Sequence, residues 1–433
     1  MREDVRRVLE GVFGFSSFRK GQEEVVLNLL KKRDVLAIMP TGSGKSLCYY
    51  IPAILQEGLT LVISPLISLM HDQVNFLRKK GINAQQINSS LTKGMRMKVL
   101  NDVVSGKCKI LYVAPERLFN EIFLKFSKLM NISMVVVDEA HCISKWGHDF
   151  RPSYIKMCEF FDMLEKRPVF ACFTATATKY VRYDILKYMK LKNPFYLVTG
   201  FNRENLFFDV IKVEEKYKIY RLLNLVEKIK DENIIIYCAT RRNVEMIYKI
   251  FSERGFSVSK YHAGLRLMQR KKGQHYFLTG EKNILIATNA FGMGVDKKDI
   301  RYIIHYNMPQ NIENYYQEVG RAGRDKKPST CILFYSEYDV KINSFFIEQT
   351  KNENLDEKEI EKIKLKNYED LKIMINFCKE KGCYRKYILG YFEEKLEYCS
   401  GCSNCLTKKR RFRIFYIFLS LIKKLKKGEF KND

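Results

Sequence analysis

Short, continuous apolar stretches that alternate with longer, helix-length segments limit most strongly how this chain can fold. In the first half such stretches occur at residues 34–40, 59–65, 109–115, 132–139 and 168–176. The pattern returns at residues 233–240, 257–262, 283–289, 301–307 and 329–335. Uninterrupted apolar runs indicate strands that are buried on both faces of a parallel sheet. The sequence therefore predicts an α/β chain with two parallel-sheet domains in tandem.

The length of 433 residues allows two or three domains. The segment TGFNREN interrupts the strand pattern, so we expect a first domain at residues 1–199 and a second at 200–338. After Tyr338 the strand pattern stops. We expect a small cysteine-bearing module at residues 339–406 and a basic, apolar tail at 407–433.

The charge balance indicates a polyanionic partner. Lys and Arg number 76 and Asp and Glu 49, which gives a net charge of +27 and points to nucleic acid or an anionic membrane. No apolar run reaches the roughly 20 residues that span a bilayer. The charged N-terminus, MREDVRRVLEG, does not resemble a signal peptide. We therefore expect a cytoplasmic protein whose twelve cysteines stay reduced.

The first apolar stretch runs into the octet MPTGSGKS at residues 39–46. A strand, a glycine-rich loop and a helix in this order form a phosphate-binding loop. Gly42 and Gly44 let backbone N–H groups approach the phosphates, Lys45 reaches the outer phosphates, and Ser46 is placed to hold Mg²⁺. The alternative is a glycine-rich turn with a solvated lysine. The general pattern has glycine where this chain has Met39.

A carboxylate pair follows another predicted strand, in VVVDEAH at residues 135–141. We expect Asp138 to bind Mg²⁺ and Glu139 to polarise the attacking water. Adjacent carboxylates at a strand end are costly unless a cation meets them. The alternative is a capping pair before a helix.

These residues, in this order, resemble the RecQ-type DNA helicases of superfamily 2 over about residues 13–405. The resemblance implies two RecA-like motor domains followed by a small helical zinc-binding module. It also implies adenine recognition by Arg19 and Gln22 within FGFSSFRKGQEEVV, and makes Met39 a feature of the family. The implied nucleotide-binding residues are Arg19, Gln22, Thr41, Gly42, Ser43, Gly44, Lys45 and Ser46.

Further segments carry the same resemblance. SPLISLMHDQV (64–74) and YVAPERL (112–118) resemble strand-tracking motifs, and FTATAT (173–178) resembles the motif that couples hydrolysis to movement. An aromatic-rich loop follows the DEAH residues, and Trp146, Phe150 and Arg151 fall on its DNA-coupling positions. An exposed aromatic ring beside basic side chains can stack on a base. The alternative is that Trp146, the only tryptophan, belongs to the core.

The second half lacks a phosphate loop but contains QEVGRAGR at residues 317–324. Arg321 and Arg324 are three residues apart, so they would share one face if this segment is helical. Such arginines can stabilise charge on a transferring phosphoryl group, so we expect both to be catalytic. The alternative is a solvated basic helix.

Four cysteines near the C-terminus have the spacing of a metal site: Cys383, Cys399, Cys402 and Cys405. Four thiolates suit tetrahedral Zn²⁺ and leave no position for a catalytic water. The segment 384–392 is expected to form the helix beside Cys383. An iron–sulfur cluster, or Cys378 in place of Cys383, is the alternative.

The leading functional hypothesis is an ATP- and Mg²⁺-dependent DNA helicase that moves 3′ to 5′ on single strands and serves recombination and repair. The resemblance alone implies the polarity. Expected partners are single-stranded and tailed duplex DNA, with a single-strand-binding protein as a further candidate. An RNA-directed helicase and a DNA-stimulated ATPase without strong unwinding are the alternatives. The tail is compatible with a packed helix, a nucleic-acid arm or, less favoured, a membrane-surface helix.

Overall fold

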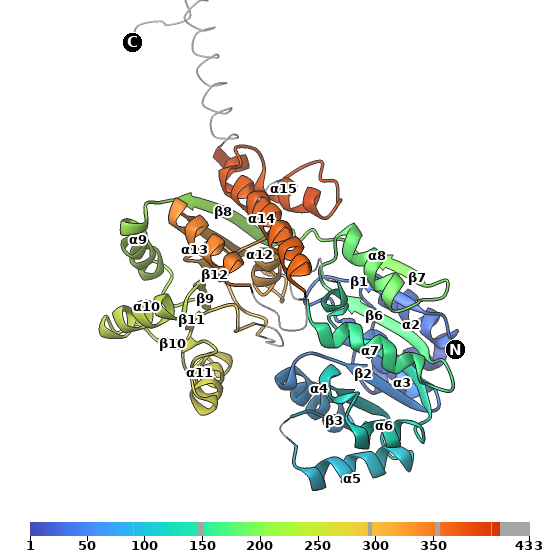
Figure 1. Cartoon of the computed structure of the whole chain (residues 1–433). Coiled ribbons are helices and arrows are strands. Elements are labelled where there is room, and N and C mark those ends of the chain that lie inside the picture. The colour runs from blue at the N-terminus through green and yellow to red at the C-terminus, as the bar shows by residue number, and fades with distance from the viewer. Residues whose placement is uncertain (90, 145–149, 293–296, 351–355, 400, 408–433) are drawn as a thin grey trace, which may run out of the picture. The chain divides into compact units, whose positions relative to one another are not determined.

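The computed structural model describes residues 1–89, 91–144, 150–292, 297–350, 356–399 and 401–407, and it contains two parallel β-sheets flanked by helices (Figure 1). Residue contacts divide the chain into two compact units. The first consists mainly of residues 1–201, and the second mainly of residues 202–291, 297–349 and the described residues from Asn367 to residue 407. The predicted α/β class with two parallel sheets is confirmed.

The first unit is built on a seven-stranded sheet with the order β3-β4-β2-β5-β6-β1-β7. Its strands are β1 (Val35–Ile38), β2 (Leu59–Ile63), β3 (Ala84–Ile87), β4 (Ile110–Val113), β5 (Ile132–Val137), β6 (Val169–Thr174) and β7 (Phe195–Val198). Its helices are α1 (Arg2–Gly11), α2 (Gln22–Leu30), α3 (Lys45–Leu55), α4 (Ile67–Lys79), α5 (Lys93–Val104), η1 (Pro115–Arg117), α6 (Glu121–Ser127), η2 (Ala140–Ile143), α7 (Pro152–Asp162) and α8 (Lys179–Tyr188).

The second unit is built on a six-stranded sheet with the order β10-β11-β9-β12-β13-β8. Its strands are β8 (Leu206–Lys212), β9 (Ile234–Tyr237), β10 (Val258–Tyr261), β11 (Ile284–Ala287), β12 (Tyr302–His305) and β13 (Ser329–Tyr335). The helices of the second half are α9 (Glu215–Glu227), α10 (Arg241–Glu253), α11 (Leu267–Thr279), α12 (Ile312–Val319), α13 (Glu337–Glu348), α14 (Glu357–Lys379) and α15 (Tyr384–Tyr391).

Each predicted apolar stretch contains a strand, but the sequence analysis missed β3, β7 and β8. All three lie at an edge of their sheet. An edge strand is covered on fewer sides, so it tolerates polar or half-exposed residues. Two glutamines, Gln85 and Gln86, stand in β3, and the residues of β7 are only partly buried.

The apolar core of each unit lies between its sheet and the covering helices. In the first unit, side chains of β1, β2, β5 and β6 pack against those of α1 to α4. In the second, β9, β11, β12 and β13 pack against α9 and α10. The buried strand residues fix the sheet, which in turn fixes where each strand-end loop begins. Among the described residues, no helix combines the length and the apolar character that crossing a bilayer requires.

Candidate active site

The connection between β1 and α3 has the backbone of a phosphate-binding loop. Gly42 and Gly44 have left-handed φ angles of 81° and 83°, a conformation that costs other L-residues about 1–2 kcal/mol. A Cβ atom on Gly44 would lie 2.6 Å from Nε2 of Gln22. Lys45 is the first residue of α3, so the loop ends at a helix N-terminus, which favours anions. Met39 is buried in the apolar core, which accounts for an apolar residue at that position.

Arg19 and Gln22 contact the backbone of this loop. Nε2 of Gln22 donates hydrogen bonds of 3.0 Å to the carbonyl oxygens of both Ser43 and Gly44. The backbone N–H of Arg19 donates to Oε1 of Gln22 at 2.8 Å, and its guanidinium donates to the Gly42 carbonyl. Both residues therefore hold the loop in this conformation. Adenine recognition by them stays a prediction, and it requires the Gln22 amide to exchange these bonds for bonds to a base.

Asp138 and Glu139 follow β5 at the same edge of the sheet as the phosphate loop, because β5 and β1 both flank β6. Burial and the neighbouring Glu139 charge raise the pKa of Asp138 to about 7, although Lys45 acts in the opposite direction. A divalent cation would relieve this repulsion. The carboxylate of Asp138 and the hydroxyl of Ser46 are hard oxygen ligands of the kind that Mg²⁺ takes, so the donor set fits the predicted ion.

His141, two residues beyond Glu139, was not among the predicted site residues, although it contacts both Glu139 and the end of β6. Its Nδ1 lies 2.9 Å from Oγ1 of Thr174, at the end of β6, and 3.4 Å from Oε2 of Glu139. Burial, with the nearby charges of Lys45 and Arg151, lowers the pKa of His141 to about 3. The ring is therefore neutral near pH 7, and its contact with Glu139 is not an ion pair. His141 links the DEAH residues to the FTATAT segment.

A cluster of tyrosine hydroxyls behind the phosphate loop was also missed. The Tyr112 hydroxyl on β4 lies 3.2 Å from that of Tyr49 and 3.0 Å from that of Tyr50, both on α3. The Tyr50 hydroxyl also donates to Oε1 of Gln73 on α4. The sequence feature that could have pointed to this cluster is the adjacent pair Tyr49 and Tyr50, which follows the phosphate loop. The cluster joins the helix of the phosphate loop to α4, which carries part of the strand-tracking segment.

The predicted DNA-coupling loop lies only partly within the described residues. Trp146 lies outside the described residues. Phe150 is half-buried. The guanidinium of Arg151 donates to the Pro65 carbonyl at 3.4 Å, and its backbone N–H donates to the Cys142 carbonyl at 3.1 Å. Arg151 therefore bridges the segment after β2 and the segment after the DEAH residues. The roles of all three residues in DNA coupling stay predictions.

The segment that carries Arg321 and Arg324 is not helical, so the condition under which the two arginines would share a helical face is not met. Helix α12 ends at Val319, and residues 320–325 form a turn. Within this turn Gly323 has a left-handed φ of 54°. The side chain of Arg321 is 6% exposed. Both arginines lie near the Tyr237 hydroxyl at the end of β9: burial raises the pKa of Tyr237 to about 12, and the positive charges of Arg321 and Arg324 act in the opposite direction.

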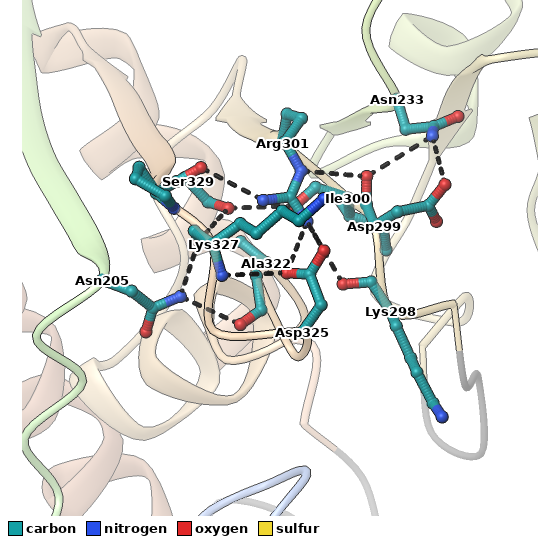
Figure 2. A network of polar contacts seen from close by, with 12 residues as sticks. Asn205, Asn233, Lys298, Asp299, Ile300, Arg301, Ala322, Asp325, Lys327 and Ser329 are labelled. Atoms are coloured by element: carbon teal, nitrogen blue, oxygen red, sulfur yellow. Dashed lines mark hydrogen bonds and ion pairs between the residues drawn. The ribbon is translucent and has the colours of Figure 1, made fainter.

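A polar network fixes this turn from several sides (Figure 2). Nδ2 of Asn205 donates to the Gly323 carbonyl at 2.9 Å, and a guanidinium nitrogen of Arg203 donates to the Ala322 carbonyl at 2.9 Å. Nη2 of Arg301 donates to both carboxylate oxygens of Asp325, each at 2.7 Å. These bonds restrain the backbone of the turn that carries Arg324. Its catalytic role stays a prediction.

The four cysteines come together as predicted. The sulfur atoms of Cys383, Cys399, Cys402 and Cys405 all lie within 4.8 Å of one another. Cys383 caps α15, and its sulfur accepts a hydrogen bond from the backbone N–H at residue 386 at 3.3 Å. Cys378 is buried elsewhere in α14 and is not part of the cluster, so the alternative ligand is not supported. Four sulfur donors in this arrangement fit Zn²⁺.

The cysteine-bearing segment is joined to the start of β8. The guanidinium of Arg385 donates to the side chain of Asn202 at 2.9 Å and to the Leu206 carbonyl. It also lies 5.2 Å from the ring centre of Phe208. The backbone N–H of Phe208 donates to the Gly401 carbonyl at 3.0 Å. These bonds explain why the segment groups with the second unit.

Three family models match successive parts of the chain. They are the DEAD/DEAH box helicase model at residues 19–183, the helicase conserved C-terminal domain at 217–326 and the RecQ zinc-binding model at 337–406. Solved structures with a similar fold include yeast Dbp5 bound to RNA and ADP BeF3, with a TM-score of 0.64, 20% identity and coverage of 83% of this chain and 97% of that one. The helicase MrfA bound to DNA and AMPPNP has a TM-score of 0.64 at 19% identity, covering 89% and 56%. At these identities the likeness concerns the fold alone.

Curated relatives are closer in sequence. The ATP-dependent DNA helicase RecQ of Bacillus subtilis is 41% identical over 407 residues, which are 94% of this chain and 67% of that protein. RecQ of Haemophilus influenzae is 40% identical over 94% of this chain and 64% of its own length. The chain thus spans about two thirds of the length of these relatives. The matches and the site geometry agree, and the chain belongs to the RecQ family of ATP-dependent DNA helicases.

Proposed function

We propose that this chain hydrolyses ATP to move 3′ to 5′ along single-stranded DNA and to separate duplex strands in recombination and repair. The observation that carries the proposal is the meeting of the phosphate loop and the DEAH carboxylates at one edge of the first sheet. Family membership supports DNA as the polymer. The polarity and the cellular role rest on the family resemblance alone.

In this mechanism the loop from Thr41 to Ser46 binds the phosphates, and Lys45 places its charge beside the outer phosphates. Asp138 and Ser46 would hold Mg²⁺, which would neutralise charge on the phosphates. Glu139 orients the attacking water and accepts its proton. Arg324, with Arg321, supplies positive charge to the transferring phosphoryl group.

The link to DNA runs through the segment after the DEAH residues. Trp146 and Phe150 stack on bases, and Arg151 connects them to the carbonyl after β2. The neutral His141 then passes a shift of this segment to Thr174 in the FTATAT motif through their 2.9 Å contact. Zinc, held by the four cysteines, has a structural role because four thiolates leave no open coordination position.

The proposed partners are single-stranded and tailed duplex DNA, with a single-strand-binding protein as a further candidate, and the proposed compartment is the cytoplasm. All twelve cysteines are free thiols in this structure, which suits a reducing compartment. With its excess of cations, the chain should bind DNA less tightly as salt rises, because Lys and Arg contacts release counterions from phosphates. A salt-independent affinity would contradict this binding mode.

The deciding experiment is unwinding of a short duplex by the purified chain with ATP and Mg²⁺, comparing 3′-tailed with 5′-tailed DNA. We expect separation of the 3′-tailed duplex only. Separation of the 5′-tailed duplex alone would overturn the polarity. Loss of unwinding with DNA-stimulated ATP hydrolysis retained would identify a translocase or DNA-stimulated ATPase, and stimulation by RNA rather than DNA would identify the other polymer.

A further inference from the structure

Residues 202–206 lead into β8 and contact two other parts of the second unit, the turn after α12 and the start of α15. The side chains of Arg203 and Asn205 donate hydrogen bonds to the turn that carries Arg324. The backbone of the same segment accepts hydrogen bonds from Arg385. The segment therefore joins the cysteine-bearing module to a residue with a proposed part in catalysis.

Arg203 holds the backbone of the turn at three points. Its guanidinium donates to the carbonyl oxygens of Gly320, Ala322 and Gly323 at 3.3, 2.9 and 3.0 Å. Carbonyls that follow the end of a helix lack partners inside it, and a planar guanidinium can satisfy several of them at once. The Gly323 carbonyl and the Arg324 N–H share one peptide plane. Fixing that carbonyl therefore fixes the backbone from which the Arg324 side chain starts.

Close packing at Gly323 limits how the turn can move. Nδ2 of Asn205 donates to the Gly323 carbonyl and to the Lys327 carbonyl, each at 2.9 Å (Figure 2). A Cβ atom on Gly323 would overlap Nδ2 of Asn205 and would lie 2.7 Å from Oγ of Ser329. The turn cannot shift toward these side chains, so its position depends on where residues 202–206 lie.

Arg385 in turn fixes the backbone of residues 202–206. Its side chain is 4% exposed, and it stands two residues after Cys383 in the cysteine cluster. The guanidinium donates to the Asn202 side chain at 2.9 Å and to the carbonyls of Arg203 and Leu206. A buried charged group is costly unless it is hydrogen-bonded. Here the backbone that carries Arg203 supplies the acceptors.

We propose that Arg203 is a positioning residue for ATP hydrolysis, which holds the turn so that Arg324 can reach the transferring phosphoryl group. The inference rests on the proposed role of Arg324 and adds the residue on which that role depends. One alternative is that the hydrogen bonds of Arg203 only stabilise the second unit. Another is that Arg203 acts by its charge alone.

The test measures kcat and KM for ATP in DNA-stimulated hydrolysis by the full chain, with urea unfolding of the same samples. We expect Arg203→Ala to lower kcat about tenfold or more and to change KM less than about twofold, because the phosphate loop is unchanged. Arg203→Lys should still lower kcat about fivefold or more, since an ammonium lacks the planar set of donors. Arg221→Ala, at an exposed position of α9, should leave kcat within about twofold.

The sharper comparison repeats Arg203→Ala in the Arg324→Ala variant. There it should lower the remaining kcat less than about twofold, because residues that act as a unit have non-additive effects. Destabilisation alone would lower kcat by the same factor in both backgrounds. Asn205→Ala removes a single side chain's hydrogen bonds to the turn, so it serves if Arg203→Ala does not fold. It should lower kcat about threefold in the parent and not in Arg324→Ala.

Three outcomes would overturn the inference. They are a kcat of Arg203→Ala equal to that of the parent, an equal fold-loss in both backgrounds, and full restoration by Arg203→Lys. Where Arg203→Ala does not fold, the same outcomes for Asn205→Ala in the two backgrounds decide. Unchanged turnover in Arg324→Ala alone would overturn the proposed role of Arg324 and this inference with it. A loss in Arg324→Ala without a loss in Arg203→Ala would overturn this inference only.

Discussion

The first strand of each sheet leads into a helix, but only in the first unit does that connection have the backbone of a phosphate-binding loop. Numbered within its own unit, and with the extra edge strand β7 left aside, each sheet has the strand order 3-4-2-5-6-1. Strands β1 and β8 are therefore counterparts. Residues 39–44 separate β1 from α3, whereas only residues 213 and 214 separate β8 from α9. The shorter connection has no room for glycines that wrap around phosphates.

The lysines after these two strands differ in the same way. Lys45 is half-buried, and its ammonium contacts the Met39 carbonyl at 3.5 Å. Lys218 in α9 is completely buried, with its ammonium 2.7 Å from Oδ1 of Asp339 and 2.9 Å from Oε2 of Glu215. Among the described residues Lys45 forms no ion pair, whereas the charge of Lys218 is paired with the carboxylates of Asp339 and Glu215. The sheet topology alone does not make a nucleotide site; the loop on its edge does.

The largest expected effect is that of zinc removal, because only the second unit should depend on zinc for its stability. Removal of zinc by a chelator, or Cys402→Ser, should destabilise the second unit strongly, because structural zinc contributes on the order of 10 kcal/mol in small zinc peptides. Calorimetry should show loss of one unfolding transition, while the transition that shifts with Mg²⁺ and ADP persists. Cys158→Ser, outside the cluster, is the control. A brown protein containing iron would contradict the zinc assignment.

The next effect tests what the second unit contributes to hydrolysis. Arg324→Ala should lower ATP turnover by about 10³-fold or more, as for other arginines that stabilise a transferring phosphoryl group. Binding of a fluorescent ATP analogue should remain measurable, because the phosphate loop is unchanged. Arg254→Ala, at an exposed position after α10, should leave turnover intact. Unchanged turnover in Arg324→Ala would remove this arginine from the mechanism.

Breaking the buried ion pair between Lys218 and Asp339 should lower the free energy of unfolding of the second unit rather than the rate of ATP hydrolysis. Lys218→Met leaves the Asp339 carboxylate buried without its cation, at a cost of about 3 kcal/mol. Urea unfolding followed by circular dichroism measures this cost. Lys216→Met, next to it on the exposed side, should show no measurable change. Equal stability of the two variants would mean that the ion pair of Lys218 does not stabilise the second unit.

Gly44→Ala tests whether the phosphate loop, which the second unit lacks, needs a glycine at this position. A side chain there would be forced into a left-handed conformation, at about 1–2 kcal/mol, and would meet the Gln22 amide. Nucleotide affinity, measured by calorimetric titration, should fall by about tenfold. Gly94→Ala, in α5 with open space around it, should bind nucleotide as the parent does. Retained affinity in Gly44→Ala would show that the loop rearranges freely.

The smallest effect concerns the turn that carries Arg324. Burial acts to raise the pKa of Asp325, but hydrogen bonds from Arg301 and from the Lys327 N–H outweigh it and lower the pKa below 3.8. The pair therefore stabilises the fold above pH 3.8 and loses this effect as pH falls through the lowered pKa. Asp325→Asn should cost at most about 1 kcal/mol at pH 7 and less in acid. A difference that grows in acid would contradict this account.

Much of the site could be predicted from sequence because its chemistry is local. The phosphate loop, the DEAH carboxylates and the four cysteines are short patterns whose members lie close in the chain or share a common spacing. The interior strands could be predicted because burial on both faces demands continuous apolar runs. The edge strands β3, β7 and β8 could not, since an edge relaxes that demand.

What the sequence by itself determined was the class of fold, the family and the short motifs that we predict to bind the phosphates and the metals. Only the tertiary structure decided the partners of those residues. It placed His141 against Thr174, gathered the hydroxyls of Tyr49, Tyr50 and Tyr112, and turned Arg321 and Arg324 off the end of α12. These contacts join residues that are far apart in the chain, and their geometry depends on strand order and packing, which no local pattern contains.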